Sequence, residues 1–461
     1  MSELFETTIC ALATPPGIGA IGVIRVSGGD AISIVNGVFP SKDLESVAAN
    51  TIHFGSIRDD HQILDEVLVS VFKAPNSYTG ENSVEISTHG SAYIQQKIIQ
   101  LLLKHGAKSA GPGEFTQRAF LHGKMDLAEA EAVADIIASN SAASHITAMQ
   151  QMRGGFSRDI KNLRQQLLDF ASLIELELDF GEEDVEFADR AKLETLIDEV
   201  LLSTDHLIES FDKGNVIKNG IPVVIAGAPN TGKSTLLNAL LNDDRAIVSP
   251  IAGTTRDTIE EELVVNGNVL RFIDTAGIRD TDDSIEAIGV KKSLEKVKSS
   301  AVVLYLFDVH EHSVGDLKII MSNLLKEVRG TKAKVIWIGN KIDHEDFTAV
   351  AHEFEQFRNL ILISARERTN LDVLLTKIIN EINIDTSNLN QTTVTNIRHY
   401  EALVGANTSL KKTKDGLQSG LSGDLLSMDI REALYYLGSI TGEVDVEELL
   451  GNIFGRFCIG K

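Results

Sequence analysis

The chain has little cysteine, no long apolar run and too few basic residues to balance its acids. Its 461 residues include two cysteines, Cys10 and Cys458, and carry a formal net charge of −23. Two thiols near opposite ends argue against a disulfide framework, so we expect a reducing cytoplasmic location. No apolar stretch reaches the ~18 residues of a membrane span, and the amino terminus lacks a signal pattern. The composition therefore predicts a protein with no membrane partner.

The acidic balance also restricts contact with nucleic acid. Indiscriminate binding to a phosphate backbone depends on lysine and arginine, and here 43 basic residues face 66 acidic ones. Any nucleic-acid contact must therefore be local or supplied by a partner. No zinc-ligand spacing and no internal repeat is present.

A glycine-rich loop stands between a predicted strand and a predicted helix. Residues 227–234 read Gly-Ala-Pro-Asn-Thr-Gly-Lys-Ser, after the apolar run 223–226 and before the helix-like 236–240. Backbone N–H groups of such a loop converge on phosphate oxygens, and the helix dipole adds to the attraction. The pattern places Lys233 at the β- and γ-phosphates and Ser234 on magnesium. A glycine-rich turn without a ligand is the alternative. The residues expected to hold the nucleotide here are Asn230, Thr231, Gly232, Lys233, Ser234 and Thr235.

Three further motifs follow predicted strands, in the order expected for a GTP site. An acid after 269–273 is placed to hold a magnesium water, at a strand end where open α/β sheets bind ligands. Asp343, after the run 335–338, is suited to accept the N1–H and the exocyclic amine of guanine, a pattern that adenine lacks. Backbone groups after 360–363 complete the base pocket. The residues in these motifs are Asp274, Thr275, Ala276, Gly277, Asn340, Lys341, Asp343, Ser364, Ala365 and Arg366.

The hydrophobic pattern predicts α/β and α+β domains together with a helical one. Residues 1–121 mix short alternating runs with turn signals, which is typical of a small α+β domain. Residues 122–215 and 385–461 show helical periodicity. Between them, residues 216–384 form the predicted nucleotide domain, a mixed sheet with flanking helices. The simplest interpretation is a P-loop GTPase domain inserted into a helical domain built from both flanks.

Several motifs together resemble one family. They are Ala13-Thr14-Pro15-Pro16-Gly17, Pro112-Gly113-Glu114-Phe115, the inserted GTPase domain and the terminal Phe457-Cys458-Ile459-Gly460-Lys461. Over its whole length the chain is similar to the tRNA-modifying GTPases of the MnmE, or TrmE, family. The resemblance implies a homodimer that acts with the flavoprotein MnmG, or GidA, on tRNA. It also implies a carboxymethylaminomethyl group placed on the wobble uridine, with formyl- or methylene-tetrahydrofolate supplying one carbon.

The same resemblance implies how GTP is hydrolysed. The segment after the loop is similar to the family's switch I, whose nucleotide-contacting residues would be Ser249, Pro250, Ile251, Ala252, Gly253 and Thr254. Thr255 would join Ser234 on magnesium. Asn230, with backbone oxygens of Ser249, Ile251 and Thr254, would hold a potassium ion that stimulates hydrolysis when two GTPase domains meet. The alternative for Asn230 is an ordinary turn residue.

Many small GTPases have a glutamine directly after the Asp274–Gly277 motif, and this glutamine positions the attacking water. Here Ile278 follows the motif and cannot orient water by hydrogen bonding, so another residue must do so. Glu286 matches the family's catalytic glutamate, although an acid in an acidic loop is usually only solvated. We therefore expect Lys233, Asn230 and Glu286 to serve hydrolysis. The resemblance also implies that Cys458 takes part in the modification, and the alternative is a packed apolar thiol.

The ligand of the amino-terminal domain is inferred from the resemblance alone. Arg25, Glu85, Lys124 and Lys461 match the family's folate-binding positions, and their charges suit folate's carboxylates and its ring amide and amine. Two other functions share parts of the pattern. One is a regulatory ribosome-assembly-type GTPase, which usually appends a basic RNA-binding module. The other is a stand-alone folate-dependent transferase with a regulatory GTPase domain. The sequence leaves open which tRNAs are used, which nitrogen donor serves, and how hydrolysis is coupled to modification.

Overall fold

The computed structural model divides the chain into two compact, discontinuous units. Unit 1 comprises Met1–Ala134, Gln151–Ile197 and Thr408–Lys461, and unit 2 comprises Asp135–Gln150 and Asp198–Asn407. The residues that the structure describes are 7–179, 190–242, 261–265, 267–273, 300–311, 313–331, 333–344, 347–354, 356–357, 359–382, 392–444, 447–455 and 457–460.

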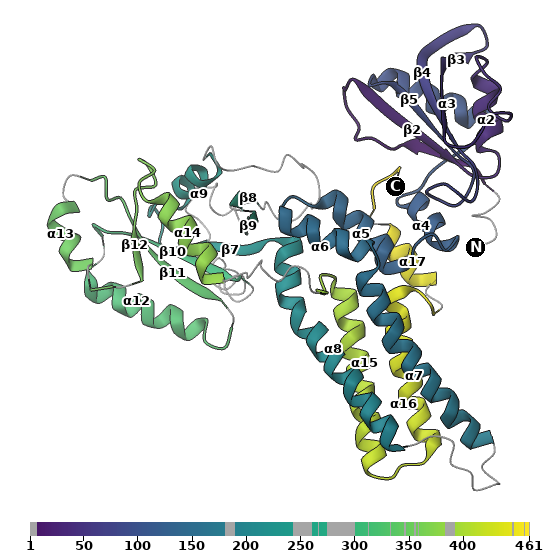
Figure 1. Ribbon diagram of the computed structural model, residues 1–461. Coiled ribbons are helices and arrows are strands. Elements are labelled where there is room, and N and C mark those ends of the chain that lie inside the picture. The colour runs from purple at the N-terminus through teal and green to yellow at the C-terminus, as the bar shows by residue number, and fades with distance from the viewer. Residues whose placement is uncertain are drawn as a thin grey trace. The chain divides into compact units, whose positions relative to one another are not determined.

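Unit 1 begins with a sheet of order β3-β4-β5-β2-β1-β6, in which only the β1–β6 pair is parallel. Strands β2 to β5 of this sheet are labelled in Figure 1. Side chains that alternate along each strand give this sheet one buried and one exposed face. In β4, Val67, Val69 and Val71 are buried and Leu68 is exposed. Two helices cover the buried face with Val35 and Ile98 among others. The elements are β1 (Ile9–Leu12), β2 (Ile21–Ser27), α2 (Ala31–Val38), β3 (Thr51–Asp59), β4 (Gln62–Phe72), β5 (Ser83–His89), α3 (Ala92–Lys104) and β6 (Lys108–Ser109).

The rest of unit 1 is helical. Its helices are α4 (Glu114–Leu121), α7 (Gly155–Asp179), α16 (Gly423–Thr441) and α17 (Glu447–Phe454). An ion pair of 2.6 Å joins Arg164 of α7 to Glu443, just beyond α16. Leu450 and Phe454 of α17 pack against Leu127, so the last part of the chain is held against a segment more than 300 residues earlier. Local sequence could not predict this pairing, because it depends on tertiary packing.

Unit 2 contains the predicted nucleotide domain, whose sheet has the order β12-β11-β10-β7-β9-β8. Only the β8–β9 hairpin is antiparallel, and the other pairs are parallel. The carboxyl ends of parallel strands meet at one edge, and β7 lies where the strand order reverses, the usual ligand position in such sheets. The strands are β7 (Ile221–Ala226), β8 (Glu261–Val265), β9 (Asn268–Phe272), β10 (Val302–Asp308), β11 (Lys334–Asn340) and β12 (Leu360–Leu362).

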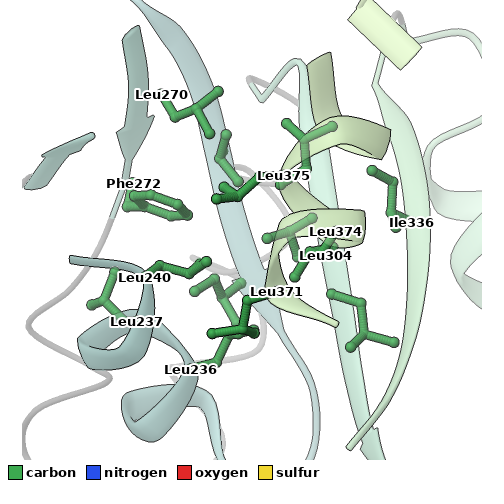
Figure 2. Packing of buried hydrophobic residues seen from close by; sticks show 14 of the residues in the cluster. Leu236, Leu237, Leu240, Leu270, Phe272, Leu304, Ile336, Leu371, Leu374 and Leu375 are labelled. Atoms are coloured by element: carbon green, nitrogen blue, oxygen red, sulfur yellow. The ribbon is translucent and has the colours of Figure 1, made fainter. Parts of the chain in front are cut away.

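Helices α9 (Lys233–Leu241) and α14 (Leu371–Ile382) bury their apolar side chains against this sheet (Figure 2). Leu236, Leu237 and Leu240 of α9 and Leu371, Leu374 and Leu375 of α14 meet Leu270, Phe272, Leu304 and Ile336 of the strands. The spacing of three and four residues in each helix presents one apolar face. This packing holds the amino terminus of α9 beside the carboxyl ends of the strands, where the glycine-rich loop emerges.

The remaining helices are α12 (Val314–Glu327), which begins with a capping box between Ser313 and Asp316, and α13 (Phe347–Phe354). Helix α6 (Ala142–Met152) lies mainly in unit 2, whereas α5 (Leu127–Ala138), α8 (Arg190–Asn219) and α15 (Ile397–Gln418) contribute residues to both units. The predicted fold class is confirmed: an α+β amino-terminal domain, helical segments on both flanks, and between them a mixed sheet with flanking helices. The exact boundaries at residues 121, 215 and 384 stay predictions. Within the described residues, no helix combines the length and apolarity that a bilayer span requires.

Candidate functional site

Two glycines shape the loop between β7 and α9. Gly227 has a φ of 149°, and a Cβ there would overlap the carbonyl oxygen of Leu306 on β10. Gly232 has a φ of 98°, and a Cβ there would overlap the side-chain amide nitrogen of Asn340. Both positions combine a left-handed backbone with close neighbours, so only glycine fits. The loop thereby lies tightly against Leu306 of β10 and Asn340 at the end of β11, on one side of β7.

Lys233, the first residue of α9, turns back over the loop. Its Nζ atom donates to the carbonyl oxygens of Gly227 at 3.0 Å and Ala228 at 2.7 Å. Burial lowers the pKa of the Lys233 ammonium, because the charged form loses water there. A phosphate group would supply the missing negative charge. The lysine therefore already lies over the loop whose N–H groups suit a phosphate.

The other predicted loop residues lie around this lysine. Thr231 is buried and donates through its hydroxyl to the Ala228 carbonyl at 2.9 Å. Asn230 is exposed with a left-handed φ of 62°. Ser234 lies in the first turn of α9, with the exposed Thr235 beside it. A hydroxyl at the amino end of a helix, next to the loop, suits a hard cation such as magnesium.

Asn340, the last residue of β11, connects the phosphate loop to the base loop. Its Nδ2 donates to the Thr231 carbonyl at 2.8 Å, and its Oδ1 accepts from the Ala365 N–H at 3.0 Å. The side chain is buried, with the residue only 3% exposed. Both ends of the amide thus serve protein groups, and Asn340 acts by positioning the two loops.

Asp343 is exposed, where a base could reach it, and one of its oxygens is already oriented. The Ser364 hydroxyl donates to Asp343 Oδ1 at 2.7 Å, and the Glu367 N–H donates to the Ser364 hydroxyl at 3.0 Å. Ser364 and Ala365 are buried, whereas the Arg366 side chain is 82% exposed and its nearest described partner is Glu367 at 3.9 Å. Asp343, Ser364 and Ala365 are therefore brought together, and Arg366 points to solvent.

Two residues near this site were not singled out from the sequence. Asp308 ends β10 and forms an ion pair of 2.5 Å with Lys341, and it accepts from the His310 N–H at 2.9 Å. Burial by itself would raise the pKa of Asp308, but the hydrogen bonds from Lys341 and His310 outweigh it and lower the pKa. Asp308 is thus held as a carboxylate. The signal that could have found Asp308 is an acid directly after the apolar run 302–307.

Many predicted site residues lie outside the described part of the chain. These are Ser249, Pro250, Ile251, Ala252, Gly253, Thr254, Thr255, Asp274, Thr275, Ala276, Gly277, Glu286 and Lys461. Their assignments to nucleotide, metal, catalysis and folate stay predictions.

In the amino-terminal domain, Arg25 of β2 and Glu85 of β5 are directly opposite in register and form an ion pair of 2.8 Å. The guanidinium carbon of Arg25 lies 5.1 Å from the Tyr78 ring centroid and 5.6 Å from that of Phe115. Burial raises the pKa of the Tyr78 phenol, even though the hydrogen bond between Tyr78 and Thr116 and the charge of Arg25 oppose the rise. Arg25 therefore contacts both a carboxylate, Glu85, and two aromatic rings at a half-buried position.

Lys124 and Cys458 have described contacts with residues other than Arg25 and Glu85. Lys124 donates to the Pro75 carbonyl at 3.0 Å. Cys458 is exposed, and its carbonyl accepts from the Gly113 N–H at 3.3 Å beside a bridge between Pro112 and Ile459. The terminal motif is thus attached to the Pro112–Phe115 motif, although the two are more than 300 residues apart.

Comparison with known proteins gives a consistent result. A family model described as the MnmE helical domain matches residues 127–458, and one described as the GTP-binding protein TrmE N-terminus matches residues 8–124. A protein of Flavobacterium psychrophilum named tRNA modification GTPase MnmE is 54% identical over 462 residues, covering 99% of this chain and 100% of its own. One of the same name from Cytophaga hutchinsonii is 53% identical, covering 98% of both chains.

Solved structures show weaker likeness. Era in complex with MgGDPNP and a segment of 16S ribosomal RNA has a TM-score of 0.27 and 25% identity, covering 41% of this chain and 66% of its own. The G domain of the T. maritima FeoB iron transporter has a TM-score of 0.25 and 22% identity, covering 35% of this chain and 98% of its own.

The glycine-rich loop after β7, joined through Asn340 to the Asp343 and Ser364 loops, defines a P-loop GTPase. The two matched models together span residues 8–458 with a short gap, and the relatives align over nearly their full length. The chain belongs to the MnmE family of tRNA modification GTPases. This membership confirms the predicted family and the predicted enzyme class.

Proposed function

We propose that this chain hydrolyses GTP in order to modify tRNA, acting with the flavoprotein MnmG to place a carboxymethylaminomethyl group on the wobble uridine. The observation that carries the GTP part is the connection made by Asn340. One buried side chain holds both the loop suited to phosphates and the loop suited to guanine. The tRNA part is supported by 54% identity to a tRNA modification GTPase over 99% of the chain.

Different residues bind the base, the phosphates and the metal, and orient the water. Asp343 accepts the two guanine N–H groups through its two carboxylate oxygens, and Lys233 exchanges its loop carbonyls for phosphate oxygens. Ser234 and Thr255 hold magnesium, which neutralises charge on the phosphates during transfer. Glu286 orients the attacking water. Because phosphoryl transfer requires little covalent chemistry from the protein, positioning and positive charge supply most of the rate.

A folate one-carbon unit binds beside Arg25 and Glu85, with Lys124 and Lys461 contributing charge. The described geometry suits such a ligand, because Arg25 lies near the faces of two aromatic rings and Glu85 is partly exposed on the same sheet face. A carboxylate accepts from the amide and amine of a pterin, while arginine and lysine bind the glutamate tail. Cys458 serves the modification chemistry from the terminal motif.

The protein acts as a homodimer through its amino-terminal domain. On the sheet face that α2 and α3 leave uncovered, Ile52 and Phe54 of β3 and Leu68 of β4 are exposed by 66%, 67% and 46%. Phe54 and Leu68 lie opposite one another in register. Exposed apolar side chains grouped on one sheet face are typical of a protein contact.

Potassium stimulates hydrolysis through Asn230 and the backbone oxygens of Ser249, Ile251 and Thr254. We expect wild-type hydrolysis to be at least about tenfold faster in potassium than in sodium at matched ionic strength, since the cation replaces an arginine finger. Asn230→Ala should remove this difference and leave GDP affinity within about threefold. Asn238→Ala, an exposed asparagine of α9, is the matched control and should keep the difference. A persistent potassium effect in Asn230→Ala would exclude Asn230 from the site.

The whole function is tested in cells that lack the protein, by mass spectrometry of nucleosides from their tRNA. We expect the carboxymethylaminomethyl uridine to disappear and to return with the wild-type chain. It should stay absent with Lys233→Ala, because that variant cannot hold the phosphates, and should return with Lys326→Ala, an exposed lysine of α12. Unchanged uridine modification combined with a ribosome defect would instead favour the ribosome-assembly alternative.

A further inference from the structure

The guanine loop depends on one carbonyl group. Residues 341–344 form a turn in which the His344 N–H donates to the Lys341 carbonyl at 3.2 Å. Asp343 occupies the third position of this turn, so the turn decides where its carboxylate lies. Lys341 has a left-handed φ of 72°. A lysine at this φ is strained and needs support from its neighbours.

The support comes from the segment that follows β10. The His310 Nε2 atom lies 3.2 Å from the same Lys341 carbonyl, and because a carbonyl only accepts, Nε2 is the donor. The Lys341 ammonium pairs with Asp308, whose other oxygen accepts from the His310 N–H. Residues 308–310 therefore hold both the side chain and the carbonyl of Lys341.

The ring of His310 also contacts the residue that closes the turn. The His310 and His344 rings lie 4.8 Å apart at an angle of 51°. His344 is the residue that closes the turn, so the ring contact joins the His310 segment to both ends of residues 341–344. His310 itself is exposed and belongs to none of the three apolar clusters of this domain.

We propose that His310 is a positioning residue for guanine specificity: by donating to the Lys341 carbonyl it fixes the turn that presents the Asp343 carboxylate to the base. This inference rests on the proposed role of Asp343 in base recognition. His310 touches neither the base nor the phosphates in this scheme, and acts only through Lys341. Without His310, the Asp343 carboxylate is held less firmly in its orientation. The phosphate loop is unchanged, because Asn340 holds it separately.

The test compares equilibrium binding of GDP and IDP to the full-length protein in magnesium. Inosine lacks the exocyclic amine of guanine, so the ratio of the two dissociation constants reports how well Asp343 meets that amine. In His310→Ala we expect GDP to bind about three- to tenfold more weakly, the usual effect of one lost hydrogen bond, with a much smaller change for IDP. The preference for GDP over IDP should fall about threefold or more. His310→Gln retains a side-chain N–H donor and should restore the preference.

His61→Ala, an exposed histidine in the β3–β4 turn of the amino-terminal sheet, is the control and should bind both nucleotides as the wild type does. Equal weakening of GDP and IDP in His310→Ala, or an unchanged preference, would overturn the role of His310. A wild-type protein without any preference for GDP over IDP would overturn base recognition by Asp343 itself, and the His310 inference with it. The two failures are therefore told apart by the wild-type measurement alone.

Discussion

Asn340→Asp should weaken GDP binding by at least about 100-fold. The wild-type amide donates to the Thr231 carbonyl and accepts from the Ala365 N–H inside the protein. A carboxylate keeps the acceptor but turns the donor into a negative oxygen against a carbonyl oxygen. Each buried polar group that loses its partner costs about 1–3 kcal/mol, and a buried unpaired charge costs more. A total of about 3 kcal/mol corresponds to about 100-fold in affinity.

Isothermal titration with GDP in magnesium measures this effect, and Asn370→Asp is the matched control. Asn370 also donates through its side-chain amide to a carbonyl, that of Leu362 at 2.8 Å, but it is exposed. Water there replaces the lost bond, so we expect less than about a fivefold change. If Asn340→Asp bound GDP as tightly as Asn370→Asp does, the connection between the two loops would have no role in binding.

Arg118→Met should destabilise the amino-terminal domain by about 3–5 kcal/mol. Arg118 is fully buried and pairs with Glu81 at 3.1 Å and Glu114 at 2.8 Å, while its Nη1 donates to the Thr7 carbonyl at 2.7 Å. Glu81 in turn accepts from the Ser27 hydroxyl at 2.9 Å. Removing the only described cation of this network leaves two acids without their charge partner, and breaking a buried pair on one side costs about this much.

Hydrogen exchange of the β2 and β5 amides in the full-length protein measures this loss without requiring the whole chain to unfold together. Arg58→Met is the control, because exposed Arg58 on β3 donates only to the Ser56 hydroxyl at 3.0 Å; we expect a change below about 0.5 kcal/mol. Adding Glu81→Gln to Arg118→Met should recover part of the stability, since it removes one unpaired charge. Equal protection in Arg118→Met and wild type would contradict the account.

The two variants affect different ligands. Ser27 lies two residues from Arg25 on β2, and Phe115 follows Glu114 on α4, so the Arg118 network holds the elements that carry the proposed folate site. Asn340 holds the nucleotide loops in the other compact unit. We therefore expect Arg118→Met to impair folate binding before GDP binding, and Asn340→Asp to do the reverse.

Strong local signals made most of the architecture predictable. The glycine-rich loop, the strand before it and the helix after it are predicted at residues 223–240, and β7 and α9 lie there. A hydrogen bond of 2.7 Å joins Asp343 to Ser364, and their role in binding guanine stays a prediction. The strand and the helix were predicted correctly, and the parallel strands bring their carboxyl ends to one edge, whatever connects them.

Contacts between distant segments were not predictable in the same way. Glu114 was noted only as part of a motif, and its pairing with Arg118 and the path from there to Glu81 emerged from the fold. His310 gave no sequence signal, because its partner is a backbone carbonyl on another loop. A carbonyl is present at every residue, so no pattern of side chains indicates which one a histidine will meet.

By itself, the amino-acid sequence determined the order of the domains, the class of nucleotide and the family, because these depend on residue type and on spacing along the chain. Tertiary structure alone decided that Asn340 joins the phosphate and base loops, that Arg118 is buried among acids, and that His310 supports the turn carrying Asp343. These arrangements depend on which backbone groups are desolvated together, and that is settled only when the sheets and helices pack.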